Sequence, residues 1–261
     1  MSPALSFSGL DISILGPAFI AGLLVLATHV PLGMQVLDRG IVFIDLAIAQ
    51  IAGIGVVAAD VMGWESSEHA WAVQVAAVGA ALLGAFLLNW TERRWPEIQE
   101  ALIGVLFVVA SCIGILLLAG NPHGGEHLKD LLVGQILWVS STQLWSVAAL
   151  TAVVLAAWFS IGRRVGRLAF YLLFALAVTA SVQLVGVYLV FSSLIVPALA
   201  TRAVSRGRLW VAYALGAIAY ALGLALSALA DWPSGAVIVL VMALAGVITS
   251  AVYGRSGRSL S

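Results

Sequence analysis

Long runs of apolar residues make up most of the chain, and charged residues occur almost only between them. Most of these runs exceed the roughly 18 to 20 residues that cross a bilayer core of about 30 Å. The runs lack the period-two alternation of barrel strands, and backbone groups in lipid must be hydrogen-bonded within their own segment, so the pattern predicts helices. Measured from charge to charge, the runs are 12–37, 46–59, 70–91, 101–123, 131–162, 168–201, 209–230 and 232–254.

The run 168–201 is too long to cross a membrane once. As a single helix it would measure about 50 Å at 1.5 Å per residue. Gly186 and Pro197 lie inside it, and we predict that they divide it into a full helix and a shorter one that turns back. The fold class predicted is therefore an all-α, polytopic membrane protein with 8 to 9 transmembrane helices, one of them short or re-entrant. We expect a single transmembrane domain over 14–254, between short tails at 1–13 and 255–261.

The cationic residues predict how the helices are oriented. Lys and Arg are enriched in cytoplasmic loops, and eleven of the twelve in this chain fall in alternate connections. We therefore expect nine crossings of the plasma (inner) membrane, with the N-terminus outside and the C-terminus in the cytoplasm. The first run is longer than the roughly 7 to 15 apolar residues of a cleaved signal, so we expect residues 1–13 to be retained. The eleven cations are Arg39, Arg93, Arg94, Arg163, Arg164, Arg167, Arg202, Arg206, Arg208, Arg255 and Arg258.

Composition supports the same class and excludes others. Hydrophobic residues make up 62% of the chain and charged residues 9%, against about 25% charged in soluble domains. The twelve basic and twelve acidic residues balance, so we expect the lipid bilayer as a partner and no nucleic acid. The connections are too short for a catalytic domain, and no P-loop pattern occurs, so we expect no enzyme activity and no nucleotide site in this chain. Cys112, inside an apolar run, is predicted to be a buried thiol.

Two carboxylates occur at the start of predicted membrane helices. Asp45 lies near the start of the second helix and Glu100 at the start of the fourth. Ionisable residues in membrane helices are costly and mark functional sites, and carboxylate oxygens are hard ligands for cations. We predict that both acids bind a transported metal or take protons. The alternative is structural: Asp45 would pair with Arg39 or Arg202, and Glu100 would reach the surface as the N-terminal acid of its helix.

The predicted outer loop 121–130 carries the most specific set of metal-binding groups. Its sequence is NPHGGEHLKD, which places His123, Glu126 and His127 within five residues. Imidazole and carboxylate suit a borderline-soft metal such as zinc, so we predict these three residues as further metal ligands. A solvated polar turn is the alternative. The spacing also matches the H-x-x-E-H pattern of inverted zinc peptidases, which leaves an intramembrane zinc hydrolase as another functional class.

Four segments together resemble the permeases of zinc and manganese ABC importers, the ZnuB type. In order along the chain they are RGIVFIDLAIAQIAGIG at 39–55, EALIG at 100–104, LLVGQILWV at 131–139 and SVQLVGVYLVFSSLIVPA at 181–198. The resemblance extends over about residues 14–252. It implies a homodimeric permease, a cytoplasmic ABC ATPase that binds ATP, and an external metal-binding protein. It also implies alternating access, no permanently bound cofactor, and a transported divalent metal, which is zinc, manganese or iron. Of these three we expect zinc first, although the ligand types in the sequence suit all three.

The resemblance implies that Asp45 and Glu100 are ligands on the transport pathway, but this sequence departs from the family pattern near Asp45. The family has a histidine four residues after this acid, where this chain has Ala49. Gln50 follows, but it is rotated by about 140° from Asp45 on a helix. We hypothesise that the loop containing His123 and His127 supplies the missing nitrogen ligands.

A second departure affects the coupling to ATP. The family has a longer cytoplasmic loop with a short ATPase-docking helix between Phe159 and Tyr171, whereas here only residues 160–168 remain. Either 91–99 or 202–208 replaces it in docking, or ATP-driven transport has been lost. The second alternative would make the protein an ATPase-independent metal carrier or a sensor.

Overall fold

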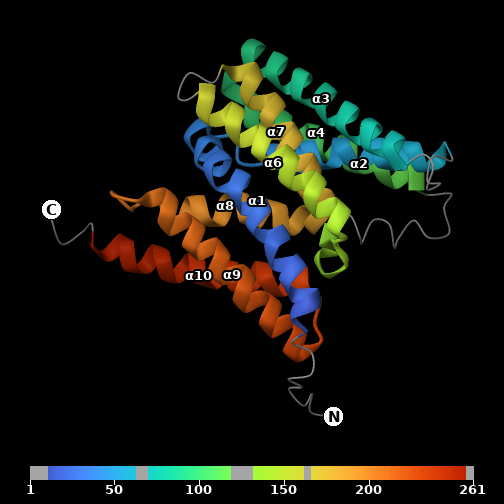
Figure 1. The fold of residues 1–261 in the computed structure, drawn as a ribbon. Helices are drawn as coiled ribbons and strands as arrows, with labels where there is room; N and C mark the ends of the chain where they lie inside the picture. The colour runs from blue at the N-terminus through green and yellow to red at the C-terminus, as the bar shows by residue number, and fades with distance from the viewer. Residues whose placement is uncertain (1–10, 63–69, 119–131, 162–165, 257–261) are drawn as a thin grey trace.

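Helices make up nearly all of the described chain in a computed structural model of the protein (Figure 1). The structure describes residues 11–62, 70–118, 132–161 and 166–256, and these contain no β-strand. Two short 3-10 helices, η3 (Pro96–Ile98) and η4 (Ile136–Trp138), precede α4 and α6. The α-helices are α1 (Ile12–Arg39), α2 (Ile44–Val61), α3 (Ala70–Arg94), α4 (Gln99–Leu118), α6 (Ser141–Ile161), α7 (Arg167–Val185), α8 (Val187–Ala200), α9 (Arg208–Ala230) and α10 (Ser234–Ser256).

Seven helices within the described ranges are long and apolar enough to cross a membrane. The other two, α2 and α8, are shorter; α8 has 14 residues and measures about 21 Å at 1.5 Å per residue. Large apolar side chains such as Leu116, Trp210 and Leu240 are exposed, as expected for surfaces that lipid covers. The predicted polytopic, all-α membrane protein is therefore confirmed, with two short helices where the sequence predicted one.

The long apolar run 168–201 is divided at Gly186. This residue has φ +81° and ψ 163°, a conformation that is essentially restricted to glycine, so α7 ends before it and α8 begins after it. The predicted contribution of Pro197 to this break is wrong, because Pro197 lies inside α8. A proline is tolerated within a membrane helix where neighbouring helices pack around the freed backbone groups, and Ser193, one turn earlier, is fully buried.

The helices form two groups with α1 between them (Figure 1). One group contains α2, α3, α4, α6 and α7, and the other contains α8, α9 and α10; α1 contacts α6 and α7 from the first group and α8 and α9 from the second. A Cβ atom at Gly33 would overlap the backbone carbonyl of Leu194, so α1 and α8 cross with their backbones in contact. The two groups are therefore held around one central helix.

Arginines collect where the helices meet at one end of the bundle. This end contains the last turns of α1, α3 and α8 and the first turns of α7 and α9. We call it the arginine-rich end; its described arginines include Arg39, Arg94, Arg167, Arg202 and Arg208.

One detail of the packing, the exposure of Cys112, differs from the predictions, and the helical glycines differ among themselves in what they contact. Cys112 is exposed, because it lies on a face of α4 that no other described helix covers. Gly79 has no atom within 4 Å of the position that a Cβ would take, so it does not serve close helix packing, whereas Gly84 and Gly216 lie against side chains of neighbouring helices.

Candidate functional site

Asp45 lies in the first turn of α2, just after the chain has turned back from α1. It is 1% exposed; the backbone N–H groups of Asp45 itself and of Leu46 face its carboxylate, and neither oxygen has a well-aligned hydrogen-bond partner among the described residues. The N-terminus of a helix favours a negative charge, but a buried carboxylate without hydrogen bonds is costly and is retained where it has a use. Asp45 is thus a buried acid that faces only the N–H groups at the start of its own helix, which leaves lone pairs on its oxygens for a ligand.

Glu100 comes to Asp45 from a different helix. It lies in the first turn of α4, and its Oε1 accepts a hydrogen bond from the backbone N–H of Phe43 at 3.3 Å. The N–H of Val42 also faces this carboxylate. Glu100 therefore caps the start of α2 from a neighbouring helix, satisfying backbone donors that a helix leaves free at its N-terminus. Its Oε2 is buried without a hydrogen-bond partner in the described part of the chain.

The structure brings Asp45 and Glu100 together, close enough for their charges to interact. Three carboxylate oxygens in this pair lack hydrogen-bond partners within the described residues: Oδ1 and Oδ2 of Asp45 and Oε2 of Glu100. Such oxygens are ligands that hard or borderline divalent cations accept. The described residues contain no group of three or more His, Cys, Asp or Glu side chains that could hold a metal, so further ligands would have to be water, backbone or groups outside these residues.

Of the structural alternatives considered for the two acids, the pairing of Asp45 with an arginine is not found among the described residues, whereas Glu100 does lie at the N-terminus of its helix. Arg39 does not pair with Asp45; its Nη1 lies 4.0 Å from Oε1 of Glu92 instead. Glu100 is only partly exposed and bonds to the turn before α2 rather than extending into solvent. The remaining predicted ligands, His123, Glu126 and His127, lie outside the described residues.

The Glu92 carboxylate also ties three helices together at the arginine-rich end. The same Oε1 lies 3.4 Å from Nε of Arg167, so the last turns of α1 and α3 and the first turn of α7 meet there. The guanidinium of Arg39 also lies 4.3 Å from the ring centroid of Phe170, a favourable cation–π geometry. Arg167 is the first residue of α7 and follows the connection 162–166 directly. The start of α7 is therefore held to α3 by the ion pair between Arg167 and Glu92.

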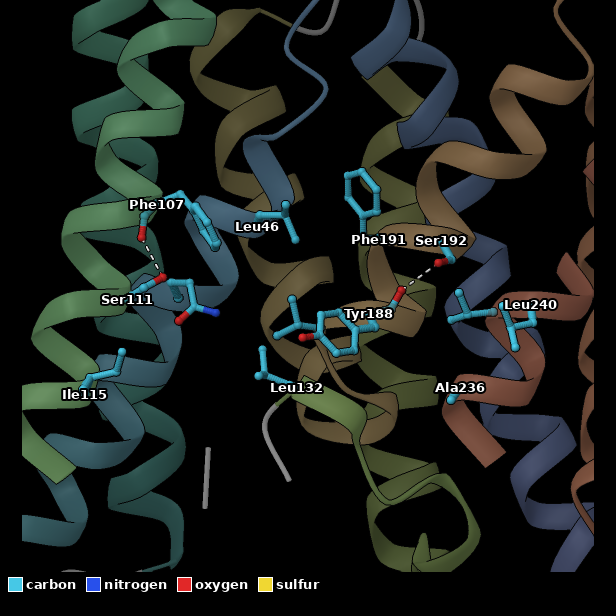
Figure 2. Close-up of a pocket in the computed structure, with 13 residues that line it drawn as sticks. Leu46, Phe107, Ser111, Ile115, Leu132, Tyr188, Phe191, Ser192, Ala236 and Leu240 are labelled. Atoms are coloured by element: carbon cyan, nitrogen blue, oxygen red, sulfur yellow. Dashed lines mark hydrogen bonds between the residues drawn. The ribbon is translucent and has the colours of Figure 1, made fainter. Parts of the chain in front are cut away.

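A cavity of about 700 Å³ lies beside the acid pair, between α2, α4, α8 and α10 (Figure 2). Most of its lining is apolar, and Leu46, which follows Asp45 directly, is part of it. The polar residues in its wall are Gln50, Ser111, Tyr188 and Ser192. Both serine hydroxyls donate to carbonyls of their own helices, at 2.8 Å each.

Sequence reasoning did not identify this cavity or its polar residues apart from Gln50. Gln50 is an amide in an otherwise apolar stretch, which was a usable signal. Ser111, Tyr188 and Ser192 carried none, because isolated hydroxyls are common in membrane helices, where they bond to the preceding turn.

The four segments that resemble the importer permeases meet in pairs. Segment 39–55 meets 100–104 through Phe43 and Glu100. Segment 131–139 meets 181–198 where Gly134 and Gly186 cross with their backbones in contact. A model of the ABC 3 transport family matches residues 11–166 and 159–253, which is most of the chain. The chain belongs to the ABC 3 transport family.

Two relatives named for metal transport match this chain over at least two thirds of its length. It is 28% identical to the manganese transport system membrane protein MntC of Halalkalibacterium halodurans, over 97% of this chain and 95% of that protein. It is 25% identical to a Haemophilus influenzae protein named "Probable iron transport system membrane protein", over 67% and 73% of the two chains. The fold is similar to that of PsaBC from Streptococcus pneumoniae, solved in complex with a Fab, with a TM-score of 0.73, 20% identity and 90% of each chain covered.

Membership of the ABC 3 family confirms the resemblance seen in the sequence. The polytopic helical bundle and the family match together make this chain a membrane permease of the ABC transporter type. Asp45 lies in segment 39–55 and Glu100 in segment 100–104, which are the first two of the four segments that resemble the importer permeases.

Proposed function

We propose that this protein is the membrane-spanning subunit of an ABC importer for a divalent transition metal. Residues 14–254 form the permease, a separate cytoplasmic ATPase supplies the energy, and an external metal-binding protein delivers the ion. Two copies form the transport unit, with the N-terminus outside and the arginine-rich end facing the cytoplasm, as the positive-inside rule implies.

The observation that carries this proposal is the isolated acid pair. Asp45 and Glu100 present three buried carboxylate oxygens without hydrogen-bond partners in the described part of the chain. A cation passing this point would exchange part of its hydration shell for these oxygens. The relatives named for manganese and iron transport support the same cargo class.

The ligand chemistry ranks the metals to be tested. Carboxylate oxygens and water suit manganese, whereas imidazole suits zinc and iron. The described pair therefore favours manganese as the first cargo to test. Zinc is expected to be preferred if His123 and His127 contribute nitrogen ligands, in which case replacing both with alanine raises the metal concentration needed for half-maximal uptake and leaves the maximal rate unchanged.

Uptake in cells that lack their own importers tests the proposal. The permease is expressed with its candidate ATPase and binding protein, and labelled manganese, zinc and iron are supplied in turn. Accumulation that disappears with an ATPase unable to hydrolyse ATP is the expected result. Accumulation that is the same with both ATPases would favour a carrier, the alternative supported by the five-residue connection 162–166 between α6 and α7.

Isosteric variants test the acid pair. Asp45→Asn and Glu100→Gln remove a charge with little change in volume, and each is expected to lower uptake by at least about 10-fold, the scale seen when groups supporting a metal are lost. Asp38→Asn is the matched control, because Asp38 is an exposed acid near the same end of the bundle. Unchanged uptake in both acid variants, with normal amounts in the membrane, would show that the acids are structural.

A further inference from the structure

The cavity between α2, α4, α8 and α10 has two different ends. Ile115 and Ala236 lie toward the end opposite the arginine-rich end, since Ile115 is near the last turn of α4 and Ala236 near the first turn of α10. Leu46, Phe107 and Phe191 lie toward the arginine-rich end, and Figure 2 shows these three in the upper part of the cavity. The large side chains at the end of the cavity nearest the acid pair are therefore all apolar.

A stacked pair of aromatic rings extends this apolar end. The ring of Phe191, in the cavity wall, stacks on the ring of Phe43 with centroids 6.3 Å apart and planes 6° apart. Phe43 lies in the turn before α2, and its N–H is the group that donates to Glu100. Phe43 thus links the two sites: its ring, 47% exposed, stacks on the ring of Phe191 in the cavity wall, and its backbone N–H donates to Glu100.

We propose that Phe43 and Phe191 form a hydrophobic barrier that separates the cavity from the acid pair and prevents passive leakage of ions. The inference rests on the proposed function, because it assumes that ions pass from the cavity to Asp45 and Glu100. Apolar constrictions in channels block hydrated ions by excluding water. The two parallel rings at the apolar end of the cavity present the same kind of surface, because a hydrated divalent cation gains no ligand from either ring.

The two rings of the barrier can be moved apart by a shift of one helix relative to another. They come from different elements, the α1–α2 turn and α8, so a relative movement of α2 and α8 separates them without breaking a helix. The turn that carries Phe43 is held by Glu100 through the Phe43 N–H. A cation bound at Oε2 of Glu100 draws charge from the same carboxylate whose Oε1 accepts from the Phe43 N–H, so cargo at the acid pair and the position of Phe43 are linked.

Passive entry of manganese into liposomes tests the barrier. The permease and its ATPase are reconstituted without ATP around a fluorophore that manganese quenches, and manganese chloride is added outside. Phe191→Ala and Phe43→Ala are each expected to raise the entry rate at least tenfold, and the double variant no further than the faster single variant, because both rings close one constriction. Phe86→Ala is the matched control: it removes the same ring from an exposed position on α3, outside the cavity.

The possible results separate the barrier from the proposed function. The barrier proposal is overturned if manganese enters at the unmodified rate in both single variants while the complexes still contain the ATPase. If Phe191→Ala does not assemble with the ATPase, Phe43→Leu decides, because it keeps the backbone N–H to Glu100 and changes only an exposed ring, matched in exposure by that of Phe86. ATP-driven uptake by the unmodified complex is measured in the same liposomes; its absence for manganese, zinc and iron overturns the proposed function, while the ATP-free comparison still decides the barrier.

Discussion

Replacing Gly186 with alanine is expected to destabilise the protein strongly. Gly186 has φ +81°, and a residue with a side chain in this region costs about 1–3 kcal/mol. The added Cβ would also lie 2.6 Å from the carbonyl carbon of Val133, and because backbone cannot move aside like a flexible side chain, overpacking adds about 1–3 kcal/mol. The total, roughly 2–6 kcal/mol, is a large part of the 5–15 kcal/mol typical of folded proteins.

Thermal unfolding of the purified protein in detergent, followed by tryptophan fluorescence, measures this effect. The midpoint of Gly186→Ala is expected to fall by at least about 4 °C, from about 2 °C per kcal/mol in a chain of this size. Gly79→Ala is the control, because its Cβ meets no atom within 4 Å and alanine is the better helix former by about 1 kcal/mol. Equal midpoints for the two variants would refute the argument that the α7–α8 break requires glycine.

Three further substitutions test contacts elsewhere in the bundle. Glu92→Gln, which removes the charge shared by two arginines at 3.4 and 4.0 Å, is expected to lower the free energy of unfolding by about 1–2 kcal/mol, measured by the same melting experiment. Tyr220→Phe leaves the buried Ser193 hydroxyl without its 2.9 Å partner and is expected to cost about 1–3 kcal/mol, which adding Ser193→Ala should largely restore. The Ser13 side chain and the Ser13 N–H, which donates to Asp11 Oδ1 at 2.8 Å, together hold the pKa of the Asp11 carboxyl below its usual value. Asp11→Ala should therefore speed hydrogen exchange of that amide at neutral pH, and in the unmodified protein the protection should disappear as the pH falls through the lowered pKa.

The sequence was sufficient to predict the membrane helices and where the chain bends. Helix formation in lipid follows from local properties, because each segment must satisfy its own backbone hydrogen bonds. Hydropathy therefore located the spans, and the need for glycine at a sharp reversal located the break at Gly186. The family resemblance was also available from four short segments and agrees with the family match over most of the chain.

The contacts between distant segments were decided only by the tertiary structure. Asp45 could have paired with Arg39 by proximity in sequence, but helix packing brings Glu92 to Arg39 instead. Glu100 caps α2 from 57 residues away, a contact that no local pattern contains. The cavity and the Phe43–Phe191 stack likewise depend on how α8 packs against α2. Hydropathy indicates whether a residue favours water or an apolar environment. It does not determine which of several equally apolar neighbours the residue contacts, because that depends on shape and close packing.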